Sequence, residues 1–274
     1  MKLTGERPME GATPDSLLAL HDAGYREVIA RLGAGTVLDV GCGVGDETVR
    51  LAGSGRTVIG VDYDPPTAIA AQARLGRSDE NGTLTFAAMD GSRVGLRDGS
   101  VDYACSSHII EHFVNPERHV AELARVLAPD GSAFFLTPNA PADFENPFHV
   151  YLFEKDQLRS LLGLFFEDVE VSGLDGSSEL KADFAARRAS GERLLKLDVL
   201  QLRRRLPRTW YVGAYTRALP VVYKVLGRNS GIGSGLDASH FFMTDEVRPD
   251  TPVLFAVARR PRQRVTSRRS RDAV

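Results

Sequence analysis

The chain has 274 residues, of which 43% are hydrophobic, and its formal net charge is -2. A chain of this length can form one large domain or a core with an insertion. Its near-neutral charge creates no overall field that would attract nucleic acid or an anionic membrane, so any such partner must bind to a local patch. It has neither a run of the ~20 apolar residues that span a bilayer nor the apolar core of a signal peptide. Both cysteines lie in apolar segments, so we expect a cytoplasmic protein with reduced thiols.

The first predicted element is a helix over residues 14–32. Thr13 and Pro14 combine a capping hydroxyl with a proline at the first helical position. Apolar residues, among them Tyr25 and Val28, then recur at helical spacing, so one face of the helix should pack on a sheet. We assign residues 1–35 to an N-terminal covering helix.

The next stretch, residues 36–46, predicts a buried strand that runs directly into a glycine-rich turn. Its sequence is TVLDVGCGVGD, with glycines at positions 41, 43 and 45. Glycine permits a positive φ and lets a ligand approach the main chain, and the helix expected near Asp46 directs free N–H groups toward that ligand. This stretch therefore predicts a cofactor loop.

The spacing of the loop distinguishes two kinds of cofactor. A dinucleotide fingerprint, GxGxxG or GxGxxA, ends in a small residue that packs under the pyrophosphate. Here that position is Asp46, which would crowd the packing and repel phosphates. An NAD-dependent oxidoreductase is therefore the weakest interpretation.

Further segments place acids and turns at the ends of later strands. Residues 57–62 read as a strand that ends in Asp62, at the offset where ribose-binding folds place a carboxylate. Residues 84–91 carry Asp90 and Gly91 just past another strand. They are followed by DYACSS at 102–107, ARVLAPDG at 124–131 and FFLTPN at 134–139.

Together with the DxGxGxG loop, these segments resemble, in order, the motifs of the class I S-adenosylmethionine (SAM)-dependent methyltransferases. The resemblance covers residues 36–139 and implies SAM as the cofactor, with Asp62 on the ribose and Asp90 on the adenine amino group. It also brings Tyr25 near the methionine end of SAM, although a plain core position for Tyr25 stays open. The residues expected to contact the cofactor are Asp39, Gly41, Cys42, Gly43, Gly45, Asp62, Tyr63, Asp90, Gly91, Ser106 and Tyr25.

Helical stretches alternate with the strands, at residues 46–52, 65–75, 116–127 and 154–162. Such alternation predicts parallel βαβ units, and the resemblance implies an α/β, Rossmann-like fold with a doubly wound, seven-stranded, mostly parallel sheet. Residues 169–171 and 252–258 read as the last two strands, which should pair antiparallel at the sheet edge. We assign residues 36–174 to the SAM-binding core and 251–260 to its last strand.

Residues 175–250 are far more than a connection between two strands needs, so we expect a helical insert, or cap, on the acceptor side. Leucines and valine from 195 to 206 fall on one helical face, and a second, aromatic-rich helix is predicted over 210–227. The insert is basic, which suits a solvated face, an anionic acceptor or a peripheral membrane contact. The basic tail, residues 261–274, predicts disorder.

A polar segment, His108-Ile109-Ile110-Glu111-His112, follows the fourth strand. In a helical turn, His108, Glu111 and His112 would share one face. His149 comes after the fifth strand, and the carboxyl ends of the strands of an open α/β sheet meet at the ligand crevice. We therefore expect these four residues to line the acceptor side of the pocket.

Three interpretations of these four residues stay open. Glu111 and His112 can cap the turn; an imidazole of His112 or His149 can act as general base toward a hydroxyl; or all four can hold a divalent metal. The metal arrangement resembles that of the small-RNA 2′-O-methyltransferases, which pair E-x-x-E-H with a later histidine, but His108 replaces the first glutamate. It resembles more loosely the ubiquinone-pathway O-methyltransferases, which carry an E-H segment here.

The expected activity is O-methylation of a small-molecule, glycan or lipid-linked acceptor. The alternative from another class is a SAM-binding partner or regulatory subunit without catalysis. RNA 2′-O-methylation ranks lower, because the sequence contains no recognisable RNA-binding module. The identity of the acceptor, the acceptor atom and the oligomeric state do not follow from the sequence.

Overall fold

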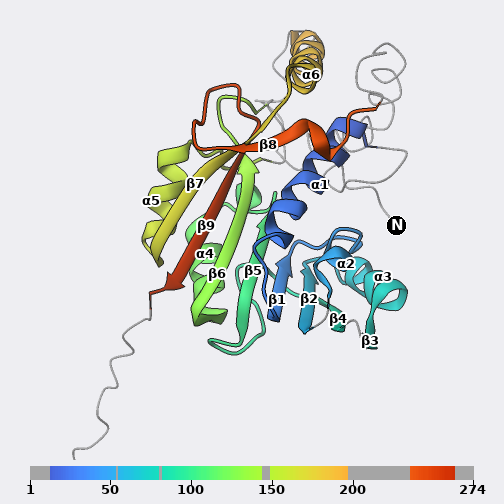
Figure 1. Cartoon of the computed structure of the whole chain (residues 1–274), viewed down its shortest axis with the longest axis vertical. Helices are drawn as coiled ribbons and strands as arrows, with labels where there is room; N and C mark the ends of the chain where they lie inside the picture. Colours follow the sequence, from blue (N-terminus) through green and yellow to red (C-terminus); the bar gives the residue numbers. More distant parts are fainter. Residues whose placement is uncertain (1–12, 54, 80–81, 144–148, 197–234, 263–274) are drawn as a thin grey trace, which may run out of the picture.

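The computed structural model describes residues 13–53, 55–79, 82–143, 149–196 and 235–262, which form one nine-stranded sheet with helices on both faces (Figure 1). The strands are β1 Gly35–Val40, β2 Arg56–Asp62, β3 Arg77–Asp79, β4 Gly82–Ala88, β5 Val101–Ser107, β6 Leu127–Pro138, β7 Phe166–Gly176, β8 Phe241–Thr244 and β9 Val253–Pro261. The helices are α1 Asp15–Ile29, α2 Thr48–Leu51, α3 Pro65–Leu75, α4 Pro116–Val126, α5 Lys155–Gly163 and α6 Ser178–Lys196, with 3-10 turns η1 Ile110–His112 and η2 Ala238–His240.

The strand order is β3-β4-β2-β1-β5-β6-β9-β7-β8, and the pairs from β4 to β6 are parallel. Strand β9 lies antiparallel between β6 and β7, which confirms the expected antiparallel end of the sheet. The predicted doubly wound, mostly parallel fold is therefore confirmed. The two short edge strands β3 and β8 extend the expected seven strands to nine, and each pairs antiparallel with its neighbour.

Parallel register brings the ends of three central strands to one edge of the sheet. Val40 aligns with Val61 of β2 and with Ser106 of β5. The segments that follow these strands, the glycine loop among them, therefore start side by side. This edge is where open α/β sheets bind ligands.

Two apolar layers hold the helices to the sheet. One buried cluster joins α1, α2 and α3 to one face, and a second joins α4 and α5 to the other. Leu123 of α4 and Leu158 of α5 are fully buried, and each such burial contributes about 1.5–3 kcal/mol. Two caps fix the starts of these helices: Asn115 accepts from the Arg118 N–H, and Glu154 forms a capping box with Gln157.

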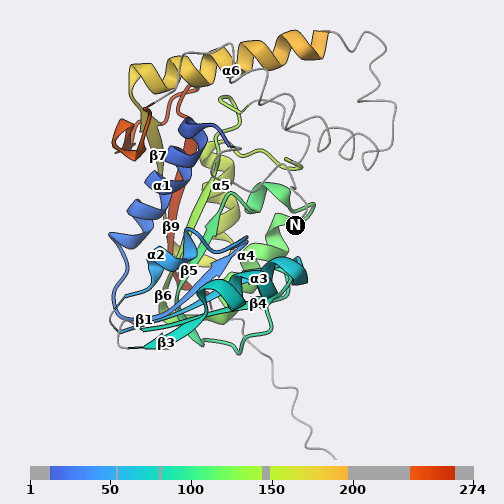
Figure 2. The same cartoon turned by 90° about the vertical axis from the view of Figure 1, so that its right-hand side faces the viewer.

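The insert begins with α6, which leaves the end of β7 and runs across the top of the molecule in Figure 2. The two ends of the predicted insert belong to the sheet, because β7 continues to Gly176 and β8 pairs with it. Residues 197–234, which include the predicted helix 210–227, and residues 263–274 of the basic tail lie outside the described residues. Among the helices described, none has the length and apolar character needed to cross a membrane.

Candidate functional site

The glycine loop after β1 has the conformation that its sequence predicts. Gly41, Gly43 and Gly45 have φ values of 78°, 54° and 86°, in the left-handed region that side chains disfavour. A Cβ on Gly41 would lie 2.1 Å from Cδ1 of Ile109. The N–H groups of Gly41 and Cys42 donate to the carbonyl of Val61 at 2.7 and 3.1 Å, so the loop is tied to β2.

Asp62 joins the end of β2 to this loop. Its carboxylate accepts from the N–H of Gly43 at 3.0 Å and from the N–H of Asp64 at 2.9 Å. Asp62 is buried, whereas the neighbouring Tyr63 is 72% exposed. The predicted ribose ligand therefore lies against the middle glycine of the loop, with an exposed aromatic ring next to it in the chain.

Asp39 and Tyr25 form an internal bond below the loop. The Tyr25 hydroxyl lies 3.1 and 3.2 Å from the two oxygens of Asp39, and the Thr48 hydroxyl donates to Asp39 at 2.6 Å. Burial raises the pKa of Asp39 to about 6, against the lowering effect of these hydrogen bonds. The polar groups of Tyr25 and Asp39, both predicted to contact the cofactor, are thus used to join α1, β1 and α2. Cys42 and Cys105 are buried in the same region.

His119 makes a second set of internal bonds that the sequence did not reveal. Its Nδ1 lies 2.8 Å from the Gly91 carbonyl, which can only accept, so Nδ1 donates and Nε2 accepts from the Ser106 hydroxyl at 2.8 Å. Burial lowers the pKa of His119 to about 4, and the ring of Phe113 stacks on it at 4.5 Å. His119 thereby connects two predicted cofactor contacts, Gly91 and Ser106.

Asp90 lies next to this connection and has its own local partners. Its carboxylate accepts from the N–H and the hydroxyl of Ser92, both at 2.8 Å, and these bonds lower the pKa of Asp90. The segment 90–92 is therefore a tight turn with an ionised acid at the start. The adenine contact expected of Asp90 stays a prediction.

Three of the four residues predicted for the acceptor side come together beyond β5 and β6. Glu111, His112 and His149 have ligand atoms within 4.8 Å of one another, and we call them the acceptor-side cluster. The rings of the two histidines lie 5.3 Å apart. The Thr137 hydroxyl donates to Glu111 Oε2 at 3.1 Å, and the N–H groups of residues 150 and 151 donate to the Glu111 carbonyl. These bonds bring the segment around His149 to η1.

Glu111 is fully buried, yet it is held as an anion. Burial alone would raise its pKa, but the imidazoles of His108, His112 and His149 lower it to about 2. Oε1 of Glu111 has no hydrogen-bond partner among the described residues. Asp143 orients the ring of His149, because its Oδ2 lies 2.9 Å from the His149 Nδ1.

His108 approaches Glu111 in a way that helical spacing does not explain. The 3-10 turn starts at Ile110, and His108 precedes it with a φ of 54°. Its Nδ1 lies 3.5 Å from Glu111 Oε1, and its ring lies 4.7 Å from that of His21. Burial lowers the pKa of His21 to about 3, so this ring is neutral. His108 is thus next to the acceptor-side cluster but outside the group of three.

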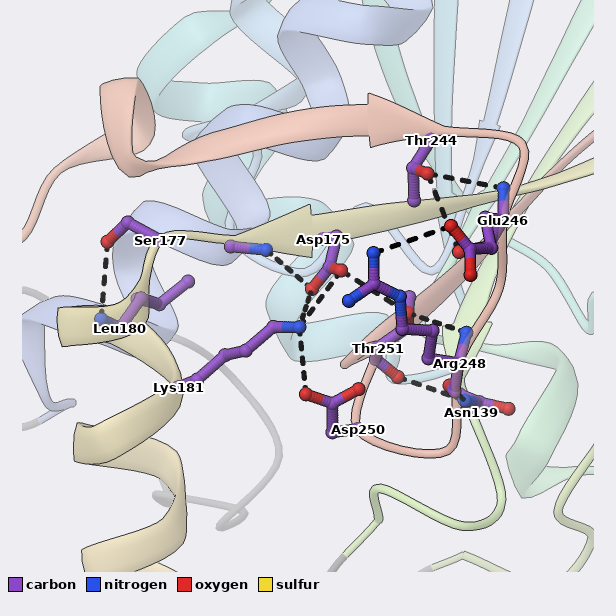
Figure 3. Close-up of polar contacts among 11 residues, drawn as sticks. Asn139, Asp175, Ser177, Leu180, Lys181, Thr244, Glu246, Arg248, Asp250 and Thr251 are labelled. Carbon is purple, nitrogen blue, oxygen red and sulfur yellow. Dashed lines mark hydrogen bonds and ion pairs between the residues drawn. The ribbon is translucent and has the colours of Figure 1, made fainter.

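A polar network beside β6 orients Asn139 (Figure 3). The Asn139 side-chain amide donates to the carbonyls of Arg248 and Thr251, both at 3.0 Å. On the other side of this loop, Lys181 of α6 contacts Asp175 at 2.9 Å and Asp250 at 2.9 Å. We call Asp175, Lys181 and Asp250 the Lys181 bridge. It ties the first helix of the insert to the loop that holds Asn139.

Comparison with known proteins places the core of the chain beside methyltransferases. Residues 38–135 match the model of a methyltransferase domain. A probable SAM-dependent methyltransferase of Mycolicibacterium smegmatis is 33% identical over 170 residues, which cover 59% of this chain and 63% of that protein. The chain thus spans slightly less than two thirds of this relative. A ubiquinone/menaquinone biosynthesis C-methyltransferase of Citrifermentans bemidjiense (30% identity; 43% of this chain, 53% of that protein) and a ubiquinone biosynthesis O-methyltransferase of Thiobacillus denitrificans (32%; 41% and 48%) also match.

The fold has solved counterparts. The structure of a SAM-dependent methyltransferase from Thermotoga maritima superimposes with a TM-score of 0.55 at 15% identity, covering 89% of this chain and 90% of that one. At this identity the likeness concerns the fold alone, and the sequence matches supply the family. Residues 38–135 thus form a methyltransferase domain, and the chain around them is similar to S-adenosylmethionine-dependent methyltransferases.

Proposed function

We propose that this protein is an enzyme that transfers the methyl group of SAM to a hydroxyl group of a small-molecule, glycan or lipid-linked acceptor. The observation that carries this proposal is the acceptor-side cluster, with a buried carboxylate and two imidazoles within 4.8 Å. Ile109, in the same segment, packs on Gly41, so the cluster follows a turn that touches the cofactor loop. Methyl donor and acceptor groups must meet at such a junction.

The residues around the loop fit SAM, which has an amino-acid end and no phosphate. The main chain at Gly41, Gly43 and Gly45 can approach the ligand closely, because no Cβ intervenes. Asp62, at the end of β2, is proposed to bind the ribose hydroxyls, and Asp90 with Gly91 the adenine. Cys42 lies within the loop and Tyr63 presents an exposed ring next to Asp62.

Other predicted contacts support the site from within the protein. The hydroxyls of Tyr25 and Ser106 and the carboxylate of Asp39 bond to internal partners. We propose that these three residues position the cofactor loop and the end of β5 rather than touch SAM with their polar atoms. This role differs from the direct contacts that the family resemblance implies.

The chemistry explains why a hydroxyl acceptor needs the cluster. Displacement at the sulfonium releases a neutral thioether, so the leaving group requires no acid. A hydroxyl acceptor, in contrast, must lose its proton as the new C–O bond forms. An imidazole of His112 or His149 can accept that proton, and the Glu111 carboxylate stabilises the imidazolium that results. A carbon acceptor, as used by one of the relatives, remains the second candidate.

The test is direct assay with labelled SAM. Purified protein is first titrated with SAM by calorimetry, and then incubated with panels of hydroxylated small molecules, oligosaccharides and lipid-linked sugars. Nuclear magnetic resonance of the product identifies the methylated atom, and a methoxy signal supports the proposal. A carbon-bound methyl group contradicts O-methylation. SAM binding without turnover on any of these classes, or on RNA tested in the same assay, favours the non-catalytic regulatory subunit.

We also propose a cytoplasmic location for this enzyme and a role for its basic insert. A cytoplasmic enzyme with reduced Cys42 and Cys105 agrees with the burial of both thiols. Helix α6 of the insert contacts the segment that precedes Asp143, since Arg188 donates to the Pro141 carbonyl at 3.0 Å. We propose that the insert selects the acceptor, including any acceptor presented at a membrane surface.

A further inference from the structure

The acceptor-side cluster has the donor set of a metal site. It offers one carboxylate and two imidazoles, and their ligand atoms lie within 4.8 Å of one another. A divalent ion with bonds of about 2.0–2.2 Å holds its ligands roughly 3–3.5 Å apart, so side-chain rotations that shorten the longest separation by about 1 Å would complete the arrangement.

The buried carboxylate is an independent sign of a missing positive charge. Glu111 is fully buried, its Oε1 has no hydrogen-bond partner within the part of the chain that the structure describes, and the His108 Nδ1 lies 3.5 Å from this oxygen. An ionised carboxylate removed from water is costly unless it is paired. Thr137 satisfies only the other oxygen, Oε2. A cation bound at Oε1 would give this oxygen a direct partner.

The orientation of His149 favours a ligand role. Asp143 Oδ2 lies 2.9 Å from His149 Nδ1, so Nδ1 carries the proton and Nε2 keeps the lone pair that a metal requires. Metal-binding histidines commonly donate their second N–H to a carboxylate, which fixes the tautomer and the ring orientation. Asp143 and His149 reproduce that pairing.

We infer that Glu111, His112 and His149 bind one zinc-class divalent cation, Zn²⁺ or Co²⁺, and that Asp143 orients His149 for this purpose. Two imidazoles with one carboxylate suit these ions better than Mg²⁺ or Ca²⁺, which prefer all-oxygen sites. Three protein ligands also leave a position open for an exogenous oxygen, as in catalytic zinc sites. His108, 3.5 Å from Glu111, lies outside the group of three.

A cation held here would act as a Lewis acid toward an acceptor hydroxyl and lower its pKa. With the cation bound, His112 and His149 serve as its ligands, and this role replaces the proton-accepting role proposed above for the same two residues. This catalytic role rests on the proposed methyltransferase activity. The binding of the cation does not, because it follows from the residues of the cluster alone.

The experiment measures binding without any assay of turnover. Protein stripped with a chelator and dialysed is titrated with Co²⁺, followed by visible absorption and calorimetry, and then with Zn²⁺ in competition. We expect one ion per chain with a visible band from imidazole-bound Co²⁺. H112A and H149A should each weaken binding by at least about 100-fold, and D143N, which removes only an orienting partner, by about 10-fold. H240A replaces a histidine outside the cluster and should bind as the wild type does.

Several results would overturn the inference. Wild-type protein that binds no stoichiometric Co²⁺ or Zn²⁺ excludes it, as does equal affinity in folded H112A and H149A. Circular dichroism and Tm establish that each variant is folded. The two proposals fail separately. Stoichiometric binding without methyl transfer removes only the enzymatic one, and methyl transfer in excess chelator without binding removes only the cation.

Discussion

The hydroxyl of Tyr25 on α1 lies 3.1 and 3.2 Å from the two carboxylate oxygens of Asp39 at the end of β1. Both residues are buried, and the Thr48 hydroxyl and the Cys105 thiol also donate to this carboxylate. The covering helix is therefore tied to the strand that leads into the glycine loop. Tyr25, which we expected near the methionine end of SAM, hydrogen-bonds to Asp39 of β1 instead.

Tyr25→Phe should lower the free energy of unfolding by about 1–3 kcal/mol, because a buried carboxylate loses a charged hydrogen bond. Chemical denaturation measures this change. SAM affinity, measured by calorimetry on the folded variant, should change much less. A variant with native stability and strongly reduced SAM affinity would instead support direct contact between the Tyr25 hydroxyl and the cofactor.

Asp62→Ala should weaken SAM binding roughly 10- to 100-fold, because each hydrogen bond to a charged group contributes about 1.5–3 kcal/mol. Calorimetry measures the affinity, and Tm reports any loss caused by the missing bond to the Gly43 N–H. Asp46→Asn is the matched control. Asp46 belongs to the same loop, but its side chain is 63% exposed and pairs with Arg74, so its loss should change affinity by less than about threefold. Equal effects of both substitutions would refute the ribose assignment.

The sheet and the glycine loop were predictable because their signals are local. Apolar runs, the glycines at alternate positions and proline-led helix starts such as Pro65 and Pro116 each act within a few residues. The edge strand β3 escaped prediction, since its three residues, RSD, form no apolar run. Its pairing depends on the neighbouring strand β4.

The partners of individual side chains were not predictable, because they come from distant segments. His119 bonds to Ser106, 13 residues away, and to Gly91, 28 residues away, so helical spacing around His119 gave no sign of either. The helical placement expected for His108 was wrong for a different reason. Spacing within a helical turn implied a shared face with Glu111, whereas its φ of 54° brings the ring there from outside the turn.

His119 should make stability depend on pH. Its folded pKa, about 4, is below the ordinary value of 6.5, so the unfolded chain binds more protons between these values. The contribution of His119 to the free energy of unfolding is fully present above pH 6.5 and is lost as pH falls toward 4. The loss is at most about 3 kcal/mol. Denaturation of wild type and His119→Gln across this range measures it, and the variant should show a flatter profile.

The difference in stability between wild type and His119→Gln separates the effect of His119 from that of other buried titratable groups. Asp39 has a raised pKa of about 6, so its contribution has the opposite sign and falls as pH rises from about 4 to 6. His21, with a pKa lowered to about 3, has the same sign as His119. These terms are common to wild type and variant and cancel in the difference. A difference that stays constant between pH 4 and 6.5 would show that His119 does not remain neutral in the folded protein.

Lys181→Met should loosen the loop that orients Asn139. Asp175 is 4% exposed and would lose its cationic partner, while Asp250 would face it without compensation. The half-exposed geometry of the bridge limits the loss to about 1–3 kcal/mol, below the cost of breaking a fully buried pair. Denaturation measures the stability, and hydrogen exchange should become faster in residues 245–252 while the glycine loop remains protected.

Lys155→Met is the matched control for this prediction. Lys155 contacts the same loop, since its Nζ donates to the Asp245 carbonyl at 2.8 Å, but the contact is exposed and should contribute less than about 1 kcal/mol. If the loop positions Asn139 for the acceptor, Lys181→Met raises the KM for the acceptor and leaves the Kd for SAM unchanged, whereas Lys155→Met alters neither. Equal exchange rates in residues 245–252 of both variants would show that the Lys181 bridge does not hold this loop.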